Sequence, residues 1–323
     1  MNKDYCVCIR TLGCAGEKYQ DLLNSLLQQT IQPKKILVYI PFGYDLPKET
    51  IGIEQYIRCE KGMVHQRSLP FDEVDTEWMM FVDDDIHIPN DGVERLFQGL
   101  EEYDGDCISP DIYHLQDCSL KEKIRAALCL AFPRKDDNWA FILRKNGSYT
   151  YNNHPTKDVL LSQSAAGACF LMKKNVYLSI HFENERWIDK FKYSVGDDLL
   201  MAYKIYLMDY KLLVHYNCGF IHLDAASGHV NNPAERYLLQ QTIWFVIWYR
   251  LFYNLKKSNR TDKVFAILAF MWRSVWDFIF GAVTRMIKNR DLLFVGYFFM
   301  ALKNGSRYVE SESYKKIPLY DEF

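Results

Sequence analysis

Three consecutive carboxylates, Asp83, Asp84 and Asp85, directly follow the apolar run of residues 78–82. Such a run is typical of a strand buried on both faces, which would end where the aspartates begin. Adjacent carboxylates repel one another, so the cluster needs solvent or a cation to offset its charge. Carboxylate oxygens suit Mg²⁺ and Mn²⁺, and both ions keep coordination sites for water and phosphate. Because ligands of α/β proteins bind beyond the carboxyl ends of strands, the position favours a metal and phosphate site over an acidic turn that caps the next helix.

A second acidic group, the pair Asp197 and Asp198, stands at the start of a predicted amphipathic helix. Acids at a helix N-terminus ordinarily cap it and stabilise a protein by roughly 0.5–2 kcal/mol, so a purely structural role is the alternative. The helix dipole would also keep a carboxylate ionised there, as a general base requires. His222 follows two apolar residues. A lone histidine is more often structural, but an imidazole can join a carboxylate in a metal site, with His215 and His229 as weaker candidates.

The elements around these residues alternate in type along the first part of the chain. Apolar runs predict strands at residues 5–11, 35–40, 55–58 and 78–82, and helical spacing predicts helices at residues 19–29 and from residue 62. This succession indicates an α/β fold with a mostly parallel, Rossmann-like sheet flanked by helices. The first strand is not followed by G-x-G-x-x-G, and the P-loop pattern G-x-x-x-x-G-K-[ST] is absent, so neither cradle for phosphates is supported.

Residues 8–11, 22–30 and 33–36 together resemble the opening of the family 2 glycosyltransferases of the GT-A fold. In that family an Arg-bearing helix and a strand ending in a D-x-D motif come next, and residues 62–67 and 83–85 occupy those places. The resemblance covers roughly residues 5–230. It implies inverting transfer of a sugar from a nucleotide-diphosphate sugar to an acceptor hydroxyl, with a glycan or a lipid-linked molecule as acceptor. Because many members of that family build surface polysaccharides, the resemblance also points to surface polysaccharide synthesis.

The resemblance also implies roles for individual residues. Asp85, with His222, would hold Mn²⁺ or Mg²⁺, and Asp198 would be the catalytic base, preceded by Asp197 where the family more commonly has Glu. Residues 165–172 resemble the strand that lines the donor pocket, where small residues let a substrate approach the backbone. The donor site is then expected to include these residues: Thr11, Arg67, Asp83, Asp84 and Gly167.

Two departures from the family pattern limit the prediction. The acidic segment that usually follows the second strand is replaced by residues 39–45, so UDP is only a default nucleotide. A Q-x-x-R-W element is absent after Asp198, which favours addition of single sugars. A sugar nucleotidyltransferase is an alternative, although residues 12–16 lack the basic side chains that grip a triphosphate. A catalytically silent carbohydrate-binding protein at the membrane is another, and the two intact acidic segments argue against it.

The composition points to a partner surface near the C-terminus. The chain has 323 residues and a net charge of −2, but residues 236–307 carry twelve Lys or Arg against three Asp, a net charge of +9 that leaves −11 for the remainder. We therefore expect a catalytic domain over residues 1–230 and a basic, aromatic-rich helical region over residues 231–323 with a flexible end. Nucleic acid is a poor partner, because the body is acidic and carries no nucleic-acid-binding motif.

Three apolar helices are predicted in this region, at residues 238–253, 264–283 and 292–302. Arg273 and Asp277 interrupt the second, so no transmembrane segment is expected. Aromatic helices with many basic residues suit the headgroups of an anionic bilayer, and packing on the core or a homodimer interface is the alternative. No signal peptide is recognised and the nine cysteines form no CxxC pair, which predicts a cytoplasmic protein, peripheral on the inner face of the cell membrane.

Overall fold

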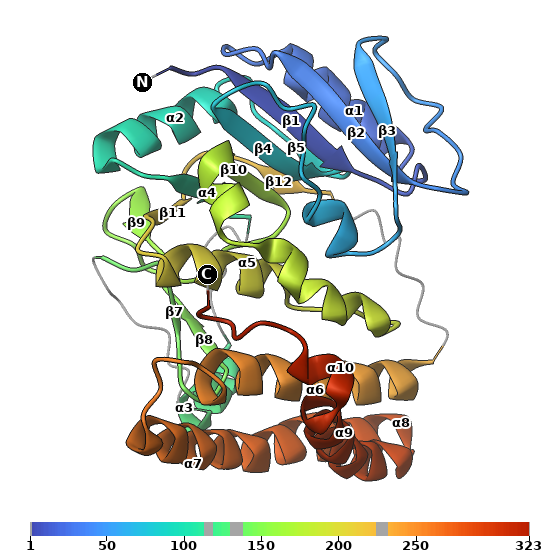
Figure 1. Ribbon diagram of the computed structural model, residues 1–323, viewed down its shortest axis with the longest axis vertical. Coiled ribbons are helices and arrows are strands. Elements are labelled where there is room, and N and C mark those ends of the chain that lie inside the picture. The colour runs from blue at the N-terminus through green and yellow to red at the C-terminus, as the bar shows by residue number, and fades with distance from the viewer. Residues whose placement is uncertain (1, 113–118, 130–137, 224–231, 323) are drawn as a thin grey trace.

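A single mixed sheet of eight strands forms the centre of the protein (Figure 1). The computed structural model describes residues 2–112, 119–129, 138–223 and 232–322. The strands β3, β2, β1 and β4 are mutually parallel; β10 then runs antiparallel to both β4 and β6, β11 is parallel to β6, and β9 is antiparallel to β11. The strands in sheet order are β3 (Glu54–Cys59), β2 (Lys35–Pro41), β1 (Tyr5–Arg10), β4 (Trp78–Asp83), β10 (Cys169–Lys173), β6 (Cys107–Pro110), β11 (Leu212–His215) and β9 (Val159–Leu161).

Both faces of this sheet are covered by helices, which is why its central strands are apolar runs. Alternate residues of β1 enter different cores: Val7 and Ile9 pack on one face, Cys6 and Cys8 on the other. The first face is covered by α1 (Glu17–Leu27) and α2 (Gly92–Tyr103). The second is covered by α4 (Lys174–Ser179), η2 (Phe182–Lys190), α5 (Asp197–Leu207) and part of α6 (Pro233–Trp248). The predicted α/β class with a mostly parallel, helix-flanked sheet is confirmed.

Smaller elements position loops beside the sheet. The ribbon of β5 (Ile86–His87) and β12 (Ile221–His222) joins the segment after β4 to the end of the α/β body. A second ribbon is formed by β7 (Phe141–Leu143) and β8 (Tyr149–Tyr151), and α3 (Leu120–Leu128) lies below it in Figure 1. The helix predicted from residue 62 is only a single 3₁₀ turn, η1 (His65–Arg67).

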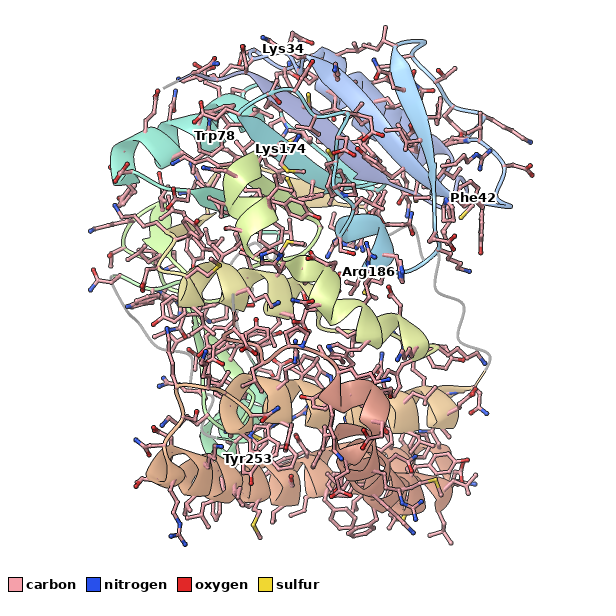
Figure 2. The ribbon with its side chains drawn as sticks, in the orientation of Figure 1. Lys34, Phe42, Trp78, Lys174, Arg186 and Tyr253 are labelled. Atoms are coloured by element: carbon pink, nitrogen blue, oxygen red, sulfur yellow. The ribbon has the colours of Figure 1, made fainter. Side chains whose placement is uncertain are left out.

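The C-terminal helices form a separate layer below the sheet (Figure 1). After α6 and its continuation η3 (Tyr249–Tyr253) come α7 (Arg260–Asp277), η4 (Phe278–Val283) and α8 (Thr284–Asn289), followed by α9 (Leu293–Glu310) and α10 (Glu312–Lys315). Side chains fill the region between the two layers (Figure 2). Within the α/β body, Arg186 of η2 donates to Ser68 at the end of η1. Among the described residues, Arg260–Asn289 is the one helix whose length and composition alone would permit a membrane crossing, and 11% of its apolar window is buried.

The prediction of a flexible C-terminal end is wrong. Tyr320 is fully buried and donates to the carbonyl of Leu200 on α5 at 2.5 Å. A buried ion cluster fixes the same region: Arg250 of η3 contacts Glu185 of η2 at 2.6 Å, and Lys204 of α5 contacts the same carboxylate at 2.9 Å. Burial by itself would raise the pKa of Glu185, but the two cations lower it to about 2. The cluster ties the helical layer to the elements that carry Asp197 and Asp198.

Candidate active site

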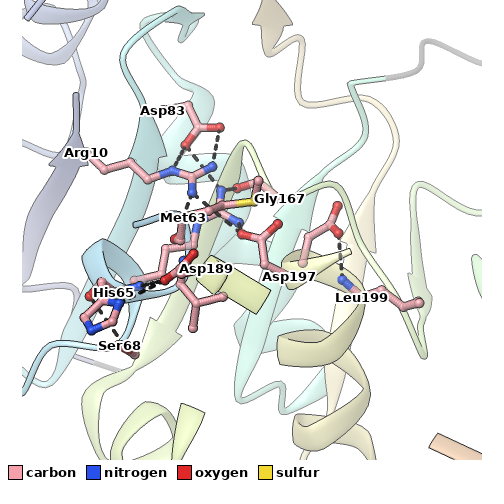
Figure 3. Close-up of polar contacts among 12 residues, drawn as sticks. Arg10, Met63, His65, Ser68, Asp83, Gly167, Asp189, Asp197 and Leu199 are labelled. Carbon is pink, nitrogen blue, oxygen red and sulfur yellow. Dashed lines mark hydrogen bonds and ion pairs between the residues drawn. The ribbon is translucent and has the colours of Figure 1, made fainter. Parts of the chain in front are cut away.

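The carboxyl ends of β1 and β4 place an arginine opposite the first aspartate of the triplet. In the parallel pairing Arg10 is the partner of Asp83, and its Nε donates to Asp83 Oδ1 at 2.6 Å (Figure 3). Burial alone would raise the pKa of Asp83, but Arg10 and Arg67 outweigh that effect and hold the pKa below its ordinary value. Asp83 is therefore a fixed carboxylate at the edge of the sheet.

Arg67 joins the two acidic segments of the sequence. Its Nη1 donates to Asp197 Oδ2 at 2.6 Å and its Nη2 to Asp83 Oδ1 at 3.3 Å, while the same nitrogen donates to the carbonyl of Gly167. Arg10 also approaches Asp197, at 3.6 Å. Arg67 is only 3% exposed, so its guanidinium holds these groups from inside the protein and does not line the open cleft. The aspartates of residues 83–85 and 197–198 thus belong to one site.

Asp198 differs from its neighbour in environment. It is half-buried at the first turn of α5, where its Oδ1 accepts the backbone N–H of Leu199 at 2.8 Å. Burial and the adjacent charge of Asp197 raise the pKa of Asp198 to about 6, and Arg67 opposes the shift. A carboxyl with this pKa is mostly ionised at pH 7 and still a competent proton acceptor.

Gly167 is the residue that allows this packing. A Cβ at that position would lie 2.7 Å from Cβ of Asp198 and 2.9 Å from Nη1 of Arg67. No side chain fits without moving one of these two groups. The sequence predicts a small residue here so that a substrate can approach the backbone. The structure adds a second reason, because the groups closest to Gly167 are those of Asp198 and Arg67.

Thr11 and Asp84 form the next contact along the cleft. The hydroxyl of Thr11 donates to Asp84 Oδ2 at 2.5 Å and accepts the backbone N–H of Gly13 at 2.8 Å. Burial raises the pKa of Asp84 to about 6 against the hydrogen bond from Thr11, and the neighbouring Asp85 and Asp83 add to the rise. The three aspartates of the triplet therefore have distinct surroundings.

The β5–β12 ribbon brings together the two residues predicted to bind a metal. His222 pairs with Ile86 across the ribbon, and its Nε2 lies 3.2 Å from Oδ1 of Asp85. The described part of the chain contains no group of three or more His, Cys, Asp or Glu arranged to hold a metal. One carboxylate and one imidazole nevertheless form a donor set that fits Mn²⁺ or Mg²⁺ when phosphate oxygens and water supply the remaining ligands.

The structure does not place His215 in this site. It is buried at the end of β11, where burial lowers the pKa of its imidazole, and it does not line the cleft. His229 lies outside the described residues.

A cleft of about 640 Å³ opens in front of these residues. Asp83, Asp84, Asp85 and His222 line it together with Thr11. Gly167, Asp197 and Asp198 do not line it: Asp197 contacts Arg10, which does, and Gly167 packs against Asp198 and Arg67 behind it. Three basic residues that the sequence analysis missed also line it: Arg10, Lys61 and Arg236. Arg236 belongs to α6, so the C-terminal region contributes to the site. The volume lies within the range of small-molecule sites, and the mixture of cations and carboxylates suits an anionic ligand with a counter-ion.

No protein-family model matches the chain, and no curated protein matches it. Solved structures of TarS from S. aureus are similar in fold. The structure of TarS 1-349 in complex with UDP-GlcNAc aligns over 95% of this chain and 81% of that chain, with 13% identity and a TM-score of 0.52. TarS itself aligns over 97% of this chain and 50% of its own length, with 14% identity and a TM-score of 0.53. The GT-A fold predicted from the sequence is confirmed at this level, and the chain spans half the length of the longer TarS structure.

Proposed function

We propose that the protein is a glycosyltransferase that moves a sugar from a nucleotide-diphosphate sugar to an acceptor hydroxyl. The observation that carries the proposal is the bridge made by Arg67 between Asp83, which lines the cleft, and Asp197, whose neighbour Asp198 has a pKa of about 6. The likeness in fold to TarS, which has been solved with UDP-GlcNAc, supports a nucleotide sugar as donor and keeps UDP as the first nucleotide to test.

The donor would lie in the cleft with its diphosphate near the carboxyl ends of β1 and β4. Asp85 and His222 would hold Mn²⁺ or Mg²⁺, which when bound offsets the negative charge that develops on a leaving diphosphate. Arg10, Lys61 and Arg236 line the same cleft and would add positive charge around the phosphates. Asp83 and Asp84, held by Arg10 and Thr11, would contact the nucleotide from fixed positions.

Asp198 would act as the general base. It would take the proton of the acceptor hydroxyl as that oxygen forms its bond to the anomeric carbon, while the bond to the diphosphate breaks on the opposite face and configuration inverts. Asp197 would not take part in proton transfer, because its carboxylate is committed to Arg67 and Arg10. The acceptor would be a glycan or a lipid-linked molecule that receives one sugar per encounter.

The direct test is donor turnover by the purified protein against a panel of nucleotide sugars, with and without EDTA. Metal-dependent release of nucleoside diphosphate that is lost in Asp198→Asn supports the proposal. Exchange of pyrophosphate into a nucleoside triphosphate would instead identify a sugar nucleotidyltransferase. If none of the donors in the panel is turned over and the protein binds sugar without a metal, the result would indicate a carbohydrate-binding protein.

A further inference from the structure

The outward face of the helix formed by α7, η4 and α8 is apolar. Along it the exposed side chains recur every three or four residues and lie within one arc of a 3.6-residue helix. Each of them is between 40% and 60% exposed: Val264, Phe265, Leu268, Met271, Trp272, Val275 and Ile279. A helix that covers the core of a water-soluble protein has the opposite arrangement, with its polar side outward.

The charged residues within the apolar stretch of this helix face the body of the protein. Arg273 pairs with Asp277 at 2.9 Å and donates to the carbonyl of Asn146 at 3.2 Å. Asp262, at its start, pairs with Lys145 at 2.5 Å. Arg273 and Asp277, which interrupt the apolar pattern in the sequence, are therefore turned away from the exposed face. The exposed face is continuously apolar between its two ends.

The start of α9 extends this apolar surface. Leu292 and Leu293 are 78% and 53% exposed, and Phe299 is 57% exposed. Phe299 lines an apolar groove of about 700 Å³ together with Met271 and Val275 of α7, so the exposed side chains of the two helices meet there. In Figure 1 these helices lie at the end of the molecule farthest from α1 and β3. An exposed apolar surface of this extent marks an interaction site.

Both ends of the face carry net positive charge. Arg260 and Lys263 outnumber Asp262 at its start, and exposed Arg285, Lys288 and Arg290 outnumber Asp291 at its end. A second copy of this chain docked through the same face in a two-fold dimer would set one basic end against another, whichever way the helices ran. A surface of anionic lipid headgroups instead complements both ends and accepts the aromatic and aliphatic side chains between them.

We propose that the face formed by α7, η4, α8 and the start of α9 docks on an anionic bilayer, with its apolar side chains among the headgroups. The helix would lie in the plane of the membrane rather than cross it. Crossing would carry the Arg273–Asp277 pair into hydrocarbon and break the contacts to Lys145 and Asn146. The negative cytoplasmic leaflet is the matching surface, which makes the protein peripheral on the inner face of the cell membrane. If the proposed transfer function holds, the same docking holds the cleft near lipid-linked acceptors.

The test is co-sedimentation of the full chain with vesicles of phosphatidylglycerol mixed with phosphatidylcholine and with vesicles of phosphatidylcholine alone. We expect binding to the anionic vesicles that weakens as salt is added. The double variant Leu268→Glu with Met271→Glu should reduce the partition coefficient by at least about tenfold. Neutralising Lys288 and Arg290 with Gln should reduce it by about fivefold for each charge.

The matched control replaces two exposed apolar residues of the sheet domain, Ile53→Glu with Leu178→Glu, which are 57% and 46% exposed and should leave vesicle binding unchanged. Circular dichroism and donor hydrolysis report that the variants remain folded, and vesicle binding needs no donor, so its outcome is independent of the transfer proposal. Absence of binding to anionic vesicles at low salt overturns the inference. So does a dimer in light scattering that Leu268→Glu with Met271→Glu converts to a monomer.

Discussion

The pKa of Asp198 gives the sharpest prediction for catalysis. Burial and the charge of Asp197 raise that pKa to about 6. A general base acts only when deprotonated, and a group with this pKa is ionised to about 90% at pH 7 and to about a tenth at pH 5. We therefore expect kcat/KM for sugar transfer to fall about tenfold between pH 7 and pH 5, at saturating Mn²⁺.

The assay is the release of nucleoside diphosphate in the presence of acceptor, measured across this range for the wild type and two variants. Asp198→Asn should lower kcat by about 10²–10⁴-fold and remove the acidic limb, because it has no base to protonate. Asp84→Asn is the matched control, since burial also raises the pKa of Asp84 to about 6. That variant should keep the limb if Asp198 is responsible for it.

The pH dependence of the free energy of unfolding tests the same pKa independently. Between about pH 4 and pH 6 the unfolded chain would ionise at residue 198 while the folded protein keeps the proton, so the free energy of unfolding falls as pH rises through this window. The upward shift of about two units corresponds to at most about 3 kcal/mol. Asp198→Asn should thus stabilise the protein at pH 7 but not at pH 3.5 in urea titrations. A flat activity profile in the wild type, with no pH dependence in this stabilisation, would refute the reasoning.

Three further predictions concern the metal, the packing and the helical layer. Asp85→Asn should abolish Mn²⁺-dependent donor binding in calorimetry, because it removes the carboxylate beside His222; an unchanged affinity would exclude Asp85 from the metal site. Gly167→Ala should lower kcat about 10²-fold by displacing Asp198 and destabilise folding by about 1–3 kcal/mol, whereas Gly296→Ala, with open space around it, should do neither. Glu185→Gln should lower the free energy of unfolding by about 3–5 kcal/mol in urea titrations, because it leaves buried cations uncompensated; a loss under 1 kcal/mol would contradict the buried cluster.

The sheet was predictable because its central strands are buried on both faces. β1 and β4 appear in the sequence as uninterrupted apolar runs, since each face lies under helices. The segment after Gly62 was predicted less well. Its expected helix is a single 3₁₀ turn, and the carboxylate of Asp189 accepts the backbone N–H groups of Val64 and His65 before it, at 3.0 and 2.8 Å. That partner lies far away in the chain, so no local pattern could announce it.

The acidic half of the site was also visible in the sequence, whereas its basic half was not. Aspartates adjacent to one another, at strand and helix ends, are a local signal, and the structure brings both segments together. Arg10 becomes part of the site through the pairing of β1 with β4, and Arg236 through the packing of α6 beside the cleft. The boundary near residue 230 stays a prediction, and Arg236 shows that the two regions share one cleft.

The two neighbouring aspartates at the start of α5 have different surroundings, which suit them to different roles. Asp197 accepts from Arg67 at 2.6 Å, and Arg67 in turn holds Asp83 at the edge of the sheet. The short side chain of Asp197 therefore reaches its partner directly. Burial raises the pKa of Asp198 toward neutrality, the fixed charge of Asp197 adds to the rise, and Arg67 prevents a larger one. In the proposed mechanism the first aspartate orders the donor side and adds to the basicity of the second, which faces the acceptor.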